Sequence, residues 1–411
     1  MKLVFYFINL LITIQVSFAR EIWVGKGMTY TSIKAAIAAS NAYDTIHINK
    51  GLYKEGNIQI TKPLTLIGHD WPEIDGEKKY EIFTIKADGV LIKGLRIQHS
   101  GYASLDDPGG IKILESRNVV IEQNWLYDNF FGVYVQYSQK CIIRQNKIEA
   151  FGKQEQEIGN GIHAWKSDSL LIDGNYIKGH RDGIYFEFVN YSNIQKNHSF
   201  GNIRYGLHFM FSNNDIYSEN EFQSNGSGVA VMYSRSVNMM NNVFRENWGD
   251  AAYGLLLKEI SDGYITGNQF HKNTVGIFME GTNRMQVHKN QFHYNGWGMK
   301  IQANCMDNEI QKNNFVANTF DVSTNGSTVL NKFNGNYWDK YSGYDLNKDG
   351  IGDVPFRPLT MFGVLVEKVP AAMLLFRSFM VLLLDQSEKV FPTLTPDQFI
   401  DPSPSMKLIK A

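Results

Sequence analysis

The 411-residue sequence contains little cysteine, little proline and no surplus of charge. Its two cysteines, Cys141 and Cys305, belong to no Cys-x-x-Cys pair, so they offer neither a zinc knuckle nor a thioredoxin-like site. The 40 basic and 41 acidic residues leave a net charge of −1, which disfavours a general binder of nucleic acid or anionic membranes. A glycine-rich phosphate loop ending in Lys-Ser or Lys-Thr is also missing, so ATP hydrolysis is not expected of this chain.

Uninterrupted apolar runs all fall short of the roughly 20 residues that a membrane-spanning helix needs. The first 19 residues instead have the pattern of an export signal. Lys2 precedes an apolar run over 3–14, and Ser17 and Ala19 are small residues at the positions that a signal peptidase recognises. We predict that residues 1–19 are removed by cleavage before Arg20, with an uncleaved anchor as the alternative.

What the sequence does have is a regularly recurring asparagine, and the steps between successive members are mostly 22 or 23 residues. The members are Asn124, Asn146, Asn175, Asn197, Asn220, Asn242, Asn268, Asn290, Asn313 and Asn336. A period near 22 is too short for helical-hairpin repeats and suits one coil of a parallel β-helix. We predict an all-β, right-handed parallel β-helix formed by a single chain, in which each Asn adopts left-handed turn geometry and hydrogen-bonds to the next in a ladder.

Apolar residues stand at constant offsets from each Asn, and pairs spaced by two, such as Val133/Val135 and Leu207/Phe209, should point inward. A glycine precedes each pair, where we expect a corner that needs backbone freedom. If each coil rises about 4.8 Å, Cys141 and Cys305 lie roughly seven coils apart, too far for a disulfide. We expect both thiols to be free and buried.

The repeat divides the chain into segments. Residues 20–109 contain a short amphipathic helix with Ile33, Ala36 and Ile37 on its apolar side, which we expect to cap the first coils. Residues 110–340 form the repeat array. Residues 341–358 are rich in Asp and Gly, and 359–411 form an apolar, helical extension with a proline-rich tail.

The Asp/Gly-rich segment begins like a calcium loop. Asp345, Asn347, Asp349 and Asp353 supply oxygens at alternate positions. The twelfth position is Phe356 rather than the bidentate Glu of an EF-hand. A calcium site and a tight turn without metal are therefore both open.

The segment 359–384 is strongly apolar but is interrupted by Glu367, Lys368, Pro370 and Arg377. It is too broken to cross a bilayer and too apolar for an ordinary solvated helix. It either packs on the open end of the β-helix or docks on another protein, such as a membrane protein. In the second case the docking residues are Phe376, Phe379 and Leu383, followed by the tail as an extended strap.

The outward positions of the strand after each glycine are unusual for an exposed stripe. In order along the array they are Tyr134/Gln136, His163/Trp165, Tyr185/Glu187, His208/Met210, Ala230/Met232, Leu256/Lys258, Phe278/Glu280 and Lys300/Gln302. Imidazole and thioether ligands suit Cu(I), so His208, Met210 and Met232 are candidate copper ligands. A surface for a protein partner, centred on Trp165 and Tyr185, explains the same residues.

A secreted β-helix also raises the hypothesis of a carbohydrate-active enzyme such as a uronate lyase or epimerase. Such an enzyme needs clustered carboxylates and basic groups, for which Asp182, Glu187 and Arg181 are the candidates. The outward stripe has no acids stacked on adjacent coils, so this second hypothesis has little support.

Several segments resemble the NosD-type proteins, periplasmic accessory proteins of nitrous oxide reductase maturation. They are "YDTIHINKGLY" at 43–53, "GLHFMFSNND" at 206–215, "YWDKYSGYDLNKDGIGDVPFRP" at 337–358 and the apolar and proline-rich stretch at 371–404. The coil repeat is shared with sugar epimerases and lyases, whereas the last three segments together are specific to this family.

The resemblance implies a periplasmic protein without catalytic turnover. NosD-type proteins belong to an assembly with a membrane permease and a cytoplasmic ATPase, and they serve copper insertion into nitrous oxide reductase together with a copper chaperone. It also implies that residues from about 359 to 404 dock on the external face of the permease. Whether the family itself binds copper does not follow from the resemblance.

Overall fold

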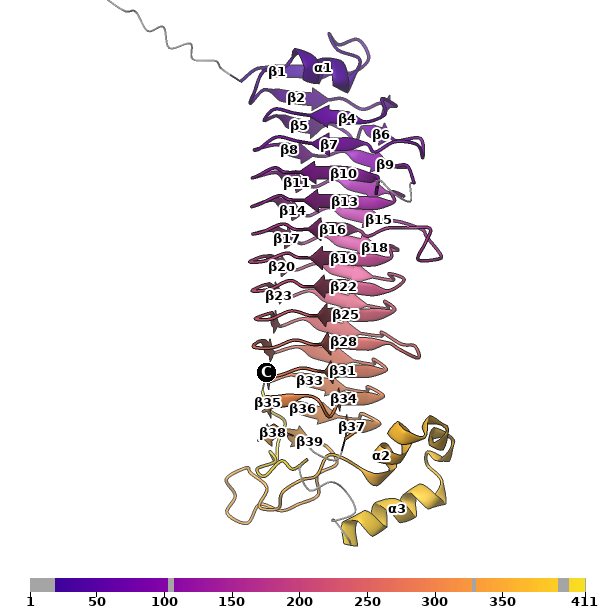
Figure 1. Ribbon diagram of the computed structural model, residues 1–411, viewed down its shortest axis with the longest axis vertical. Coiled ribbons are helices and arrows are strands. Elements are labelled where there is room, and N and C mark those ends of the chain that lie inside the picture. The colour runs from indigo at the N-terminus through magenta and orange to yellow at the C-terminus, as the bar shows by residue number, and fades with distance from the viewer. Residues whose placement is uncertain (1–18, 103–106, 327–329, 391–398, 411) are drawn as a thin grey trace, which may run out of the picture.

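The chain forms one long right-handed parallel β-solenoid of about 14 coils. In the computed structural model the coils stack along a single axis, with the N-terminal helix at one end and two helices at the other (Figure 1). The structure describes residues 19–102, 107–326, 330–390 and 399–410. The predicted fold class is confirmed, while the predicted signal peptide lies almost wholly outside the described residues.

Each coil contributes one strand to each of three parallel sheets. Sheet A contains β1 (Glu21–Val24), β2 (Thr45–Ile48), β5 (Thr65–Gly68), β8 (Leu91–Lys93), β11 (Val120–Glu122), β14 (Ile142–Arg144), β17 (Leu171–Asp173), β20 (Asn193–Gln195), β23 (Ile216–Ser218), β26 (Asn238–Met240), β29 (Tyr264–Thr266), β32 (Gln286–His288), β35 (Met306–Gln311) and β38 (Leu330–Asn334).

Sheet B follows sheet A along each coil, and its strands are short. They are β3 (Leu52–Tyr53), β6 (Glu73–Asp75), β9 (Arg96–Gln98), β12 (Trp125–Tyr127), β15 (Lys147–Glu149), β18 (Tyr176–Lys178), β21 (His198–Phe200), β24 (Glu221–Gln223), β27 (Val243–Arg245), β30 (Gln269–His271), β33 (Gln291–His293), β36 (Asn314–Val316) and β39 (Tyr337–Trp338).

Sheet C contains the longer strands that follow the glycines. They are β4 (Ile58–Ile60), β7 (Phe83–Ile85), β10 (Gly109–Leu114), β13 (Phe131–Gln136), β16 (Ile162–Trp165), β19 (Asp182–Glu187), β22 (Tyr205–Met210), β25 (Ser227–Met232), β28 (Tyr253–Lys258), β31 (Val275–Glu280), β34 (Trp297–Ile301) and β37 (Phe320–Ser323).

The predicted cap is helix α1 (Ile33–Ala39), which covers the first coils with Ile33, Ala36 and Ile37 buried. Its N-terminal cap is Ser32, whose hydroxyl accepts a hydrogen bond from the amide of Ala35. Glu55, which lies one coil away in the chain, accepts from the amide of Ile33. Sequence and structure agree on this end of the solenoid.

The core is a single apolar column inside the three sheets, and the predicted inward pairs are fully buried in it. Phenylalanines from successive coils stack in parallel: the ring centroids of Phe244 and Phe270 are 4.7 Å apart, and those of Phe292 and Phe315 are 4.6 Å apart. Cys141 and Cys305 are free and buried, as expected. Because each coil packs only on its neighbours, the stability of the core depends on continuous stacking.

The recurring asparagines form the predicted ladder. In the middle of the array, the backbone amide and Nδ2 of Asn197 both donate to Oδ1 of Asn220 at 2.9 Å, and Asn220 repeats this toward Asn242 at 3.0 Å. The predicted left-handed geometry of the Asn itself is wrong. The residue before each Asn adopts it, for example Lys196 with φ of 55° and Glu219 with φ of 56°. The ladder requires the Asn side chain to point inward, so the residue before it adopts the left-handed geometry of the turn.

A second asparagine ladder, which the sequence analysis missed, lies five residues further along each coil. It comprises Asn202, Asn225, Asn247, Asn273, Asn295 and Asn318. His180 occupies the same position one coil earlier and donates its amide to Asn202, with both ring nitrogens buried. The signal was present as a fixed offset of five from the first ladder.

The glycines before the inward pairs serve close packing rather than backbone freedom, which corrects the prediction. Gly132, Gly161, Gly206 and Gly228 all lack a positive φ. A Cβ on Gly206 would lie 2.6 Å from the carbonyl oxygen of Gly228, and one on Gly132 would lie 2.4 Å from that of Gly161. Stacked coils at this corner leave no room for a side chain.

A buried carboxyl in sheet A gives the fold a pH dependence. Burial raises the pKa of Asp215 to about 8, although the amide of Ser192 donates to it. Between about pH 4 and 8 the folded chain keeps a proton that the unfolded chain releases, so stability falls as pH rises, by up to about 1.4 kcal/mol per unit. We expect Asp215→Asn to remove this slope and to raise the midpoint of urea unfolding at pH 7.5. An unchanged slope in the variant would contradict the assignment.

The C-terminal end is closed by the last segment of the chain. Phe399 is buried in the core, and Asp401 is buried beneath Asn336. Ser405 pairs with Tyr337 and with Ile351. The part of the predicted docking segment at 399–404 therefore packs on its own solenoid, because the last coil needs a cover.

Candidate functional site

The candidate site is the outer face of sheet C, where the sequence predicted a stripe of unusual residues. Tyr134, His163, Tyr185 and His208 lie in direct register on β13, β16, β19 and β22, and we call them the ring ladder. Two residues further along the same strands runs a second line, which we call the outer row. It comprises Gln136, Trp165, Glu187, Met210, Met232, Lys258 and Glu280.

The ring ladder is less exposed than predicted. Its centroids are 4.6 to 4.9 Å apart from one coil to the next, and Phe131 and Tyr205 also pack against it. Tyr134, His163 and His208 are therefore only 7, 9 and 5% exposed. Burial lowers the pKa of His163 to about 3. The outward direction of these side chains was predictable from the repeat, but the covering of large rings by rings on adjacent coils was not.

An ion pair lies beside the ladder. Arg204 donates from Nε and Nη2 to the two carboxylate oxygens of Asp182, at 2.9 and 2.6 Å. Nδ1 of His208 lies 3.5 Å from Oδ2 of the same carboxylate. Burial alone would raise the pKa of Asp182, but His208 and Arg204 outweigh it and the pKa is lowered. Sequence reasoning missed Arg204, which follows the second asparagine ladder by two residues.

The proposed carboxylates of a carbohydrate enzyme do not form a pair. Asp182 and Glu187 stand at the two ends of β19, roughly 16 Å apart along the strand. The two carboxyls of a glycosidase are about 5 to 9.5 Å apart. Arg181, the predicted basic partner, donates to Asn160 instead. These three residues are therefore not brought together around one substrate.

The candidate copper ligands are neighbours in the lattice of strands. Met210 and Met232 are register partners on β22 and β25, and His208 lies two residues before Met210. The single hydroxyl hydrogen of Tyr185 is shared between Oε2 of Glu187 at 3.2 Å and the sulfur of Met210 at 3.7 Å. Nδ1 of His208 faces the carboxylate of Asp182, whereas its Nε2 is buried without a hydrogen-bond partner among the described residues. The arrangement places two methionines in register and leaves one imidazole nitrogen without a partner.

An exposed aromatic ladder borders these methionines and was not predicted. Phe188, Phe211 and Tyr233 each follow an outer-row residue, and their rings stack with centroids 5.1 Å apart. All three adopt a positive φ at the turn that ends the strand. The sequence signal for this ladder is an aromatic residue directly after the second outward position in three successive coils.

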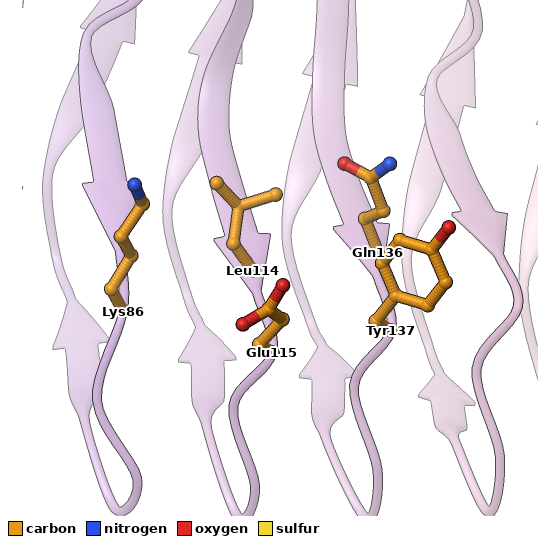
Figure 2. A pocket seen from close by; sticks show the side chains of 5 residues that line it. All are labelled: Lys86, Leu114, Glu115, Gln136 and Tyr137. Carbon is orange, nitrogen blue, oxygen red and sulfur yellow. The ribbon is translucent and has the colours of Figure 1, made fainter.

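A shallow hollow of about 320 Å³ opens at the same edge of sheet C, in earlier coils. Figure 2 shows its lining side chains at and just beyond the ends of neighbouring strands: Lys86, Leu114, Glu115, Gln136 and Tyr137. Gln136 belongs to the outer row, so the hollow continues that line toward the N-terminus. None of the candidate metal ligands lines it.

The Asp/Gly-rich loop uses its own backbone to satisfy its carboxylates. Asp345 accepts from the amides of Asp349 and Gly350, at 3.2 and 2.8 Å, and Asp353 accepts from the amide of Leu346. Nδ2 of Asn347 donates to Asp349. These are the contacts of a tight Asx-type turn. Among the described residues no group of three or more His, Cys, Asp or Glu is arranged to hold an ion, and the calcium site stays a prediction.

The apolar extension forms α2 (Met361–Lys368), the 3-10 helix η1 (Pro370–Leu375) and α3 (Phe379–Val390). Phe362 packs against Phe320 of β37, and Lys300 of β34 forms an ion pair of 2.8 Å with Glu367. Figure 1 shows α2 and α3 beside and beyond the last coils, where they are joined to the solenoid through α2. In the described part of the chain, every helix is too short or too polar to cross a bilayer.

Much of this extension is apolar and uncovered. Phe379 is 73% exposed, Leu383 is 45% exposed, and Phe376 is 38% exposed where it stacks on Phe362. We call the exposed set the helical apolar surface. It comprises Leu374, Leu375, Phe376, Phe379, Met380, Leu382 and Leu383. Contiguous apolar surface of this kind is typical of protein or membrane contacts.

Comparison with known proteins finds similarity to one family. The model of the family described as periplasmic copper-binding protein (NosD) matches residues 149–343, and a model of the right-handed β-helix region matches 22–174. A probable ABC transporter binding protein NosD of Pseudomonas aeruginosa is 28% identical over 372 residues, covering 86% of each chain. A protein of the same description from Stutzerimonas stutzeri is 27% identical over 374 residues, covering 86% of this chain and 85% of its own.

The chain is therefore similar to the NosD-type proteins. The family model covers the ring ladder from His163 and the outer row from Trp165, and it ends before the helical extension. The matches to the two relatives extend over most of the chain.

Solved structures share the fold. The catalytic domain of a GH87 α-1,3-glucanase in complex with nigerose superposes with a TM-score of 0.60 at 12% identity, covering 78% of this chain and 69% of its own. Tailspike protein 3 of bacteriophage CBA120 gives a TM-score of 0.50 at 14% identity, covering 73% and 57%. At these identities the likeness shows a shared β-solenoid fold, and no activity is inferred from it.

Proposed function

We propose that this chain is the periplasmic subunit of an ABC-transporter-type complex that supports assembly of the copper site of nitrous oxide reductase. It acts as a scaffold rather than as a catalyst. Its relatives are described as ABC transporter binding proteins, and the matching family as periplasmic and copper-binding, which supports this role. The chain has no phosphate-binding loop, so a cytoplasmic ATPase subunit supplies the hydrolysis.

The observation that carries the proposal is the helical apolar surface on an otherwise closed solenoid. A rigid column with one uncovered apolar end is suited to docking on a partner by that end. The partner is the external face of the membrane permease, and Phe376, Phe379 and Leu383 are the contacts. The solenoid then extends away from the membrane and presents sheet C to soluble proteins.

Copper is the cargo, and the Met210–Met232 pair with His208 is the candidate place for it. Thioethers and imidazole are the donors that Cu(I) favours. Nε2 of His208 is buried without a hydrogen-bond partner among the described residues, which fits a ligand role because buried nitrogens are normally hydrogen-bonded. Trp165 and Tyr185 on the same face would then contact the copper chaperone or the reductase.

The alternative of a carbohydrate-active enzyme has no observation in its favour. Asp182 is fully buried and is engaged by Arg204, so it is not available to a sugar. Glu187 lies at the far end of the strand from it.

The test is the copper content of nitrous oxide reductase purified from cells that lack this chain. We expect a reductase without its copper centres, with loading restored by the full chain. A triple variant, His208→Ala, Met210→Ala and Met232→Ala, should bind the permease and ATPase normally but restore less than a tenth of the copper. Normal loading without the chain, or activity of the purified chain on uronate polymers, would overturn the proposal.

A further inference from the structure

A second group of metal-ligating side chains lies at the opposite end of the solenoid, on the outer face of the first coils of sheet A. Trp23 of β1 is the register partner of His47 of β2, and His69 follows the end of β5 in the next coil. The amide of His69 donates to the carbonyl of Ile48, which holds it beside β2. Three successive coils therefore bring an indole and two imidazoles together.

The two imidazoles face each other through their nitrogens. Nδ1 of His47 lies 2.8 Å from Nε2 of His69. The indole of Trp23 stacks on both rings, with centroids 4.4 Å from His47 and 5.2 Å from His69. The His47 side chain is 15% exposed and Trp23 is 42% exposed, so solvent reaches the pair.

Glu21 fixes which nitrogen of His47 is available. Its carboxylate contacts Nε2 of His47, and an ionised carboxylate only accepts hydrogen bonds. Nε2 of His47 therefore carries the hydrogen, and the lone pair on Nδ1 points at His69. In the present arrangement Nε2–H of His69 donates to that lone pair. If His69 instead carries its hydrogen on Nδ1, both lone pairs face the same gap.

We infer that His47 and His69 form a Cu(I) site, with Glu21 as the carboxylate that orients His47 and Trp23 as the aromatic cover. This site lies outside the candidate ligands on sheet C and does not depend on the proposed role in reductase assembly. Coordination involves no electron transfer. The two imidazole lone pairs replace solvent or buffer ligands on Cu(I), and the hydrogen of His69 moves through solvent from Nε2 to Nδ1 of the same ring.

The donor set favours Cu(I) over zinc. Protein zinc is almost always bound by three or four protein ligands. Glu21 contacts the other ring nitrogen of His47, and no group of three or more His, Cys, Asp or Glu is arranged to hold one ion among the described residues. Cu(I) is stable between two imidazoles in a linear arrangement. With metal–nitrogen bonds of about 2 Å, the nitrogens must separate to about 4 Å, which rotation of the partly exposed rings permits.

The two other groups have known uses around metal sites. A ligating histidine commonly donates its second ring N–H to a carboxylate, which fixes the tautomer and makes the ligand more basic. Glu21 is placed to do this for His47. A cation held beside the face of an indole is stabilised by the ring quadrupole. Trp23 also provides an optical reporter within the site.

The experiment is anaerobic titration of the full chain with Cu(I) against a chromophoric chelator, followed by tryptophan fluorescence. The protein is purified without a histidine tag and carries the triple substitution of His208, Met210 and Met232, so that only the new site is measured. We expect one equivalent of Cu(I) to bind and to quench part of the fluorescence. The double variant His47→Asn and His69→Asn should bind at least tenfold more weakly and lose the quenching.

His198→Asn is the matched control, because His198 is a partly exposed histidine beside an aromatic ring and a glutamate on another coil. It should bind and quench like the parent. The Trp23→Phe variant should still bind one equivalent of Cu(I), but binding should no longer quench the tryptophan fluorescence. If the double variant unfolds, the X-ray absorption spectrum of copper bound to the parent chain is the deciding measurement, since two nitrogen ligands at about 2 Å are expected. Unchanged binding in the double variant, or a spectrum of four-coordinate copper, would overturn the site.

Failure here is distinct from failure of the proposed function. Suppose that the His47→Asn and His69→Asn variant loses its equivalent of Cu(I) but still supports normal copper loading of the reductase. The Cu(I) site then exists in the parent chain but takes no part in assembly of the reductase. A reductase that matures without the chain removes the proposed function and leaves the titration unaffected.

Discussion

Replacing Asp401 by alanine is expected to lower the free energy of unfolding by about 3 to 5 kcal/mol, because it leaves several buried donors without an acceptor. Asp401 is fully buried and terminates the first asparagine ladder. Its carboxylate accepts from the amides of Gly335 and Asn336, from Nδ2 of Asn336 and from Nε1 of Trp338, all at 2.9 to 3.1 Å. Chemical denaturation followed by far-UV circular dichroism and tryptophan fluorescence measures the loss.

Two control variants distinguish the loss of the buried hydrogen bonds of Asp401 from the loss of a carboxylate at the surface. Asp401→Asn keeps one acceptor oxygen, as each Asn of the ladder has, and should recover about half of the loss. Asp349→Ala removes an exposed carboxylate from the neighbouring loop and should cost less than about 0.5 kcal/mol. A loss in Asp401→Ala no larger than in Asp349→Ala would show that the closing segment contributes little to the solenoid.

The interior of this protein could be predicted from the sequence because the repeat fixes the phase of each coil. Once Asn220 is taken as a reference, the inward direction of Val229 and Val231 follows from the alternation of a strand, and both are buried. The position of the residue with left-handed backbone geometry could not be predicted in this way. Glu219 makes the turn, since Asn220 must point its amide into the ladder.

What could not be predicted depends on contacts between coils. The exposure of His208 is set by Tyr205 on its own strand and by Tyr185 on the preceding coil, and a single coil does not contain the second contact. The ion pair of Asp182 with Arg204 joins residues 22 apart in the sequence. Among the candidate copper ligands, the placement of Met210 beside Met232 was predictable because they are one repeat apart, and they are register partners.

The end of the chain was the hardest part to predict, because a non-repeating segment returns to the solenoid. Phe399 and Asp401 lie more than 60 residues after Asn336, and composition alone marked this region as a proline-rich tail. Truncation after Thr360 would remove both the helical apolar surface and the segment that closes the core. Lost binding to a partner by such a truncated chain would not separate docking from unfolding, so point substitutions are needed.

If the chain docks on the proposed permease–ATPase complex through α3, the triple variant Phe379→Ser, Leu382→Ser and Leu383→Ser is expected to weaken that binding at least a hundredfold. Each of the three side chains is exposed on α3 and lies outside the packed cluster of Phe320, Phe362 and Val366. Large apolar residues at the centre of an interface contribute about 2 kcal/mol or more each, and 1.4 kcal/mol is about tenfold in affinity. Affinity for the detergent-solubilised complex is measured by biolayer interferometry.

The matched control replaces three exposed aromatic residues on the solenoid wall, Tyr191→Ser, Tyr264→Ser and Tyr294→Ser, which removes a similar apolar area far from α3. It should bind like the parent chain. Both variants should unfold at the parental denaturant concentration, since none of the six side chains is buried in the core. If the α3 variant binds normally and the wall variant does not, the partner contacts the side of the solenoid, and the helical apolar surface covers something other than the permease.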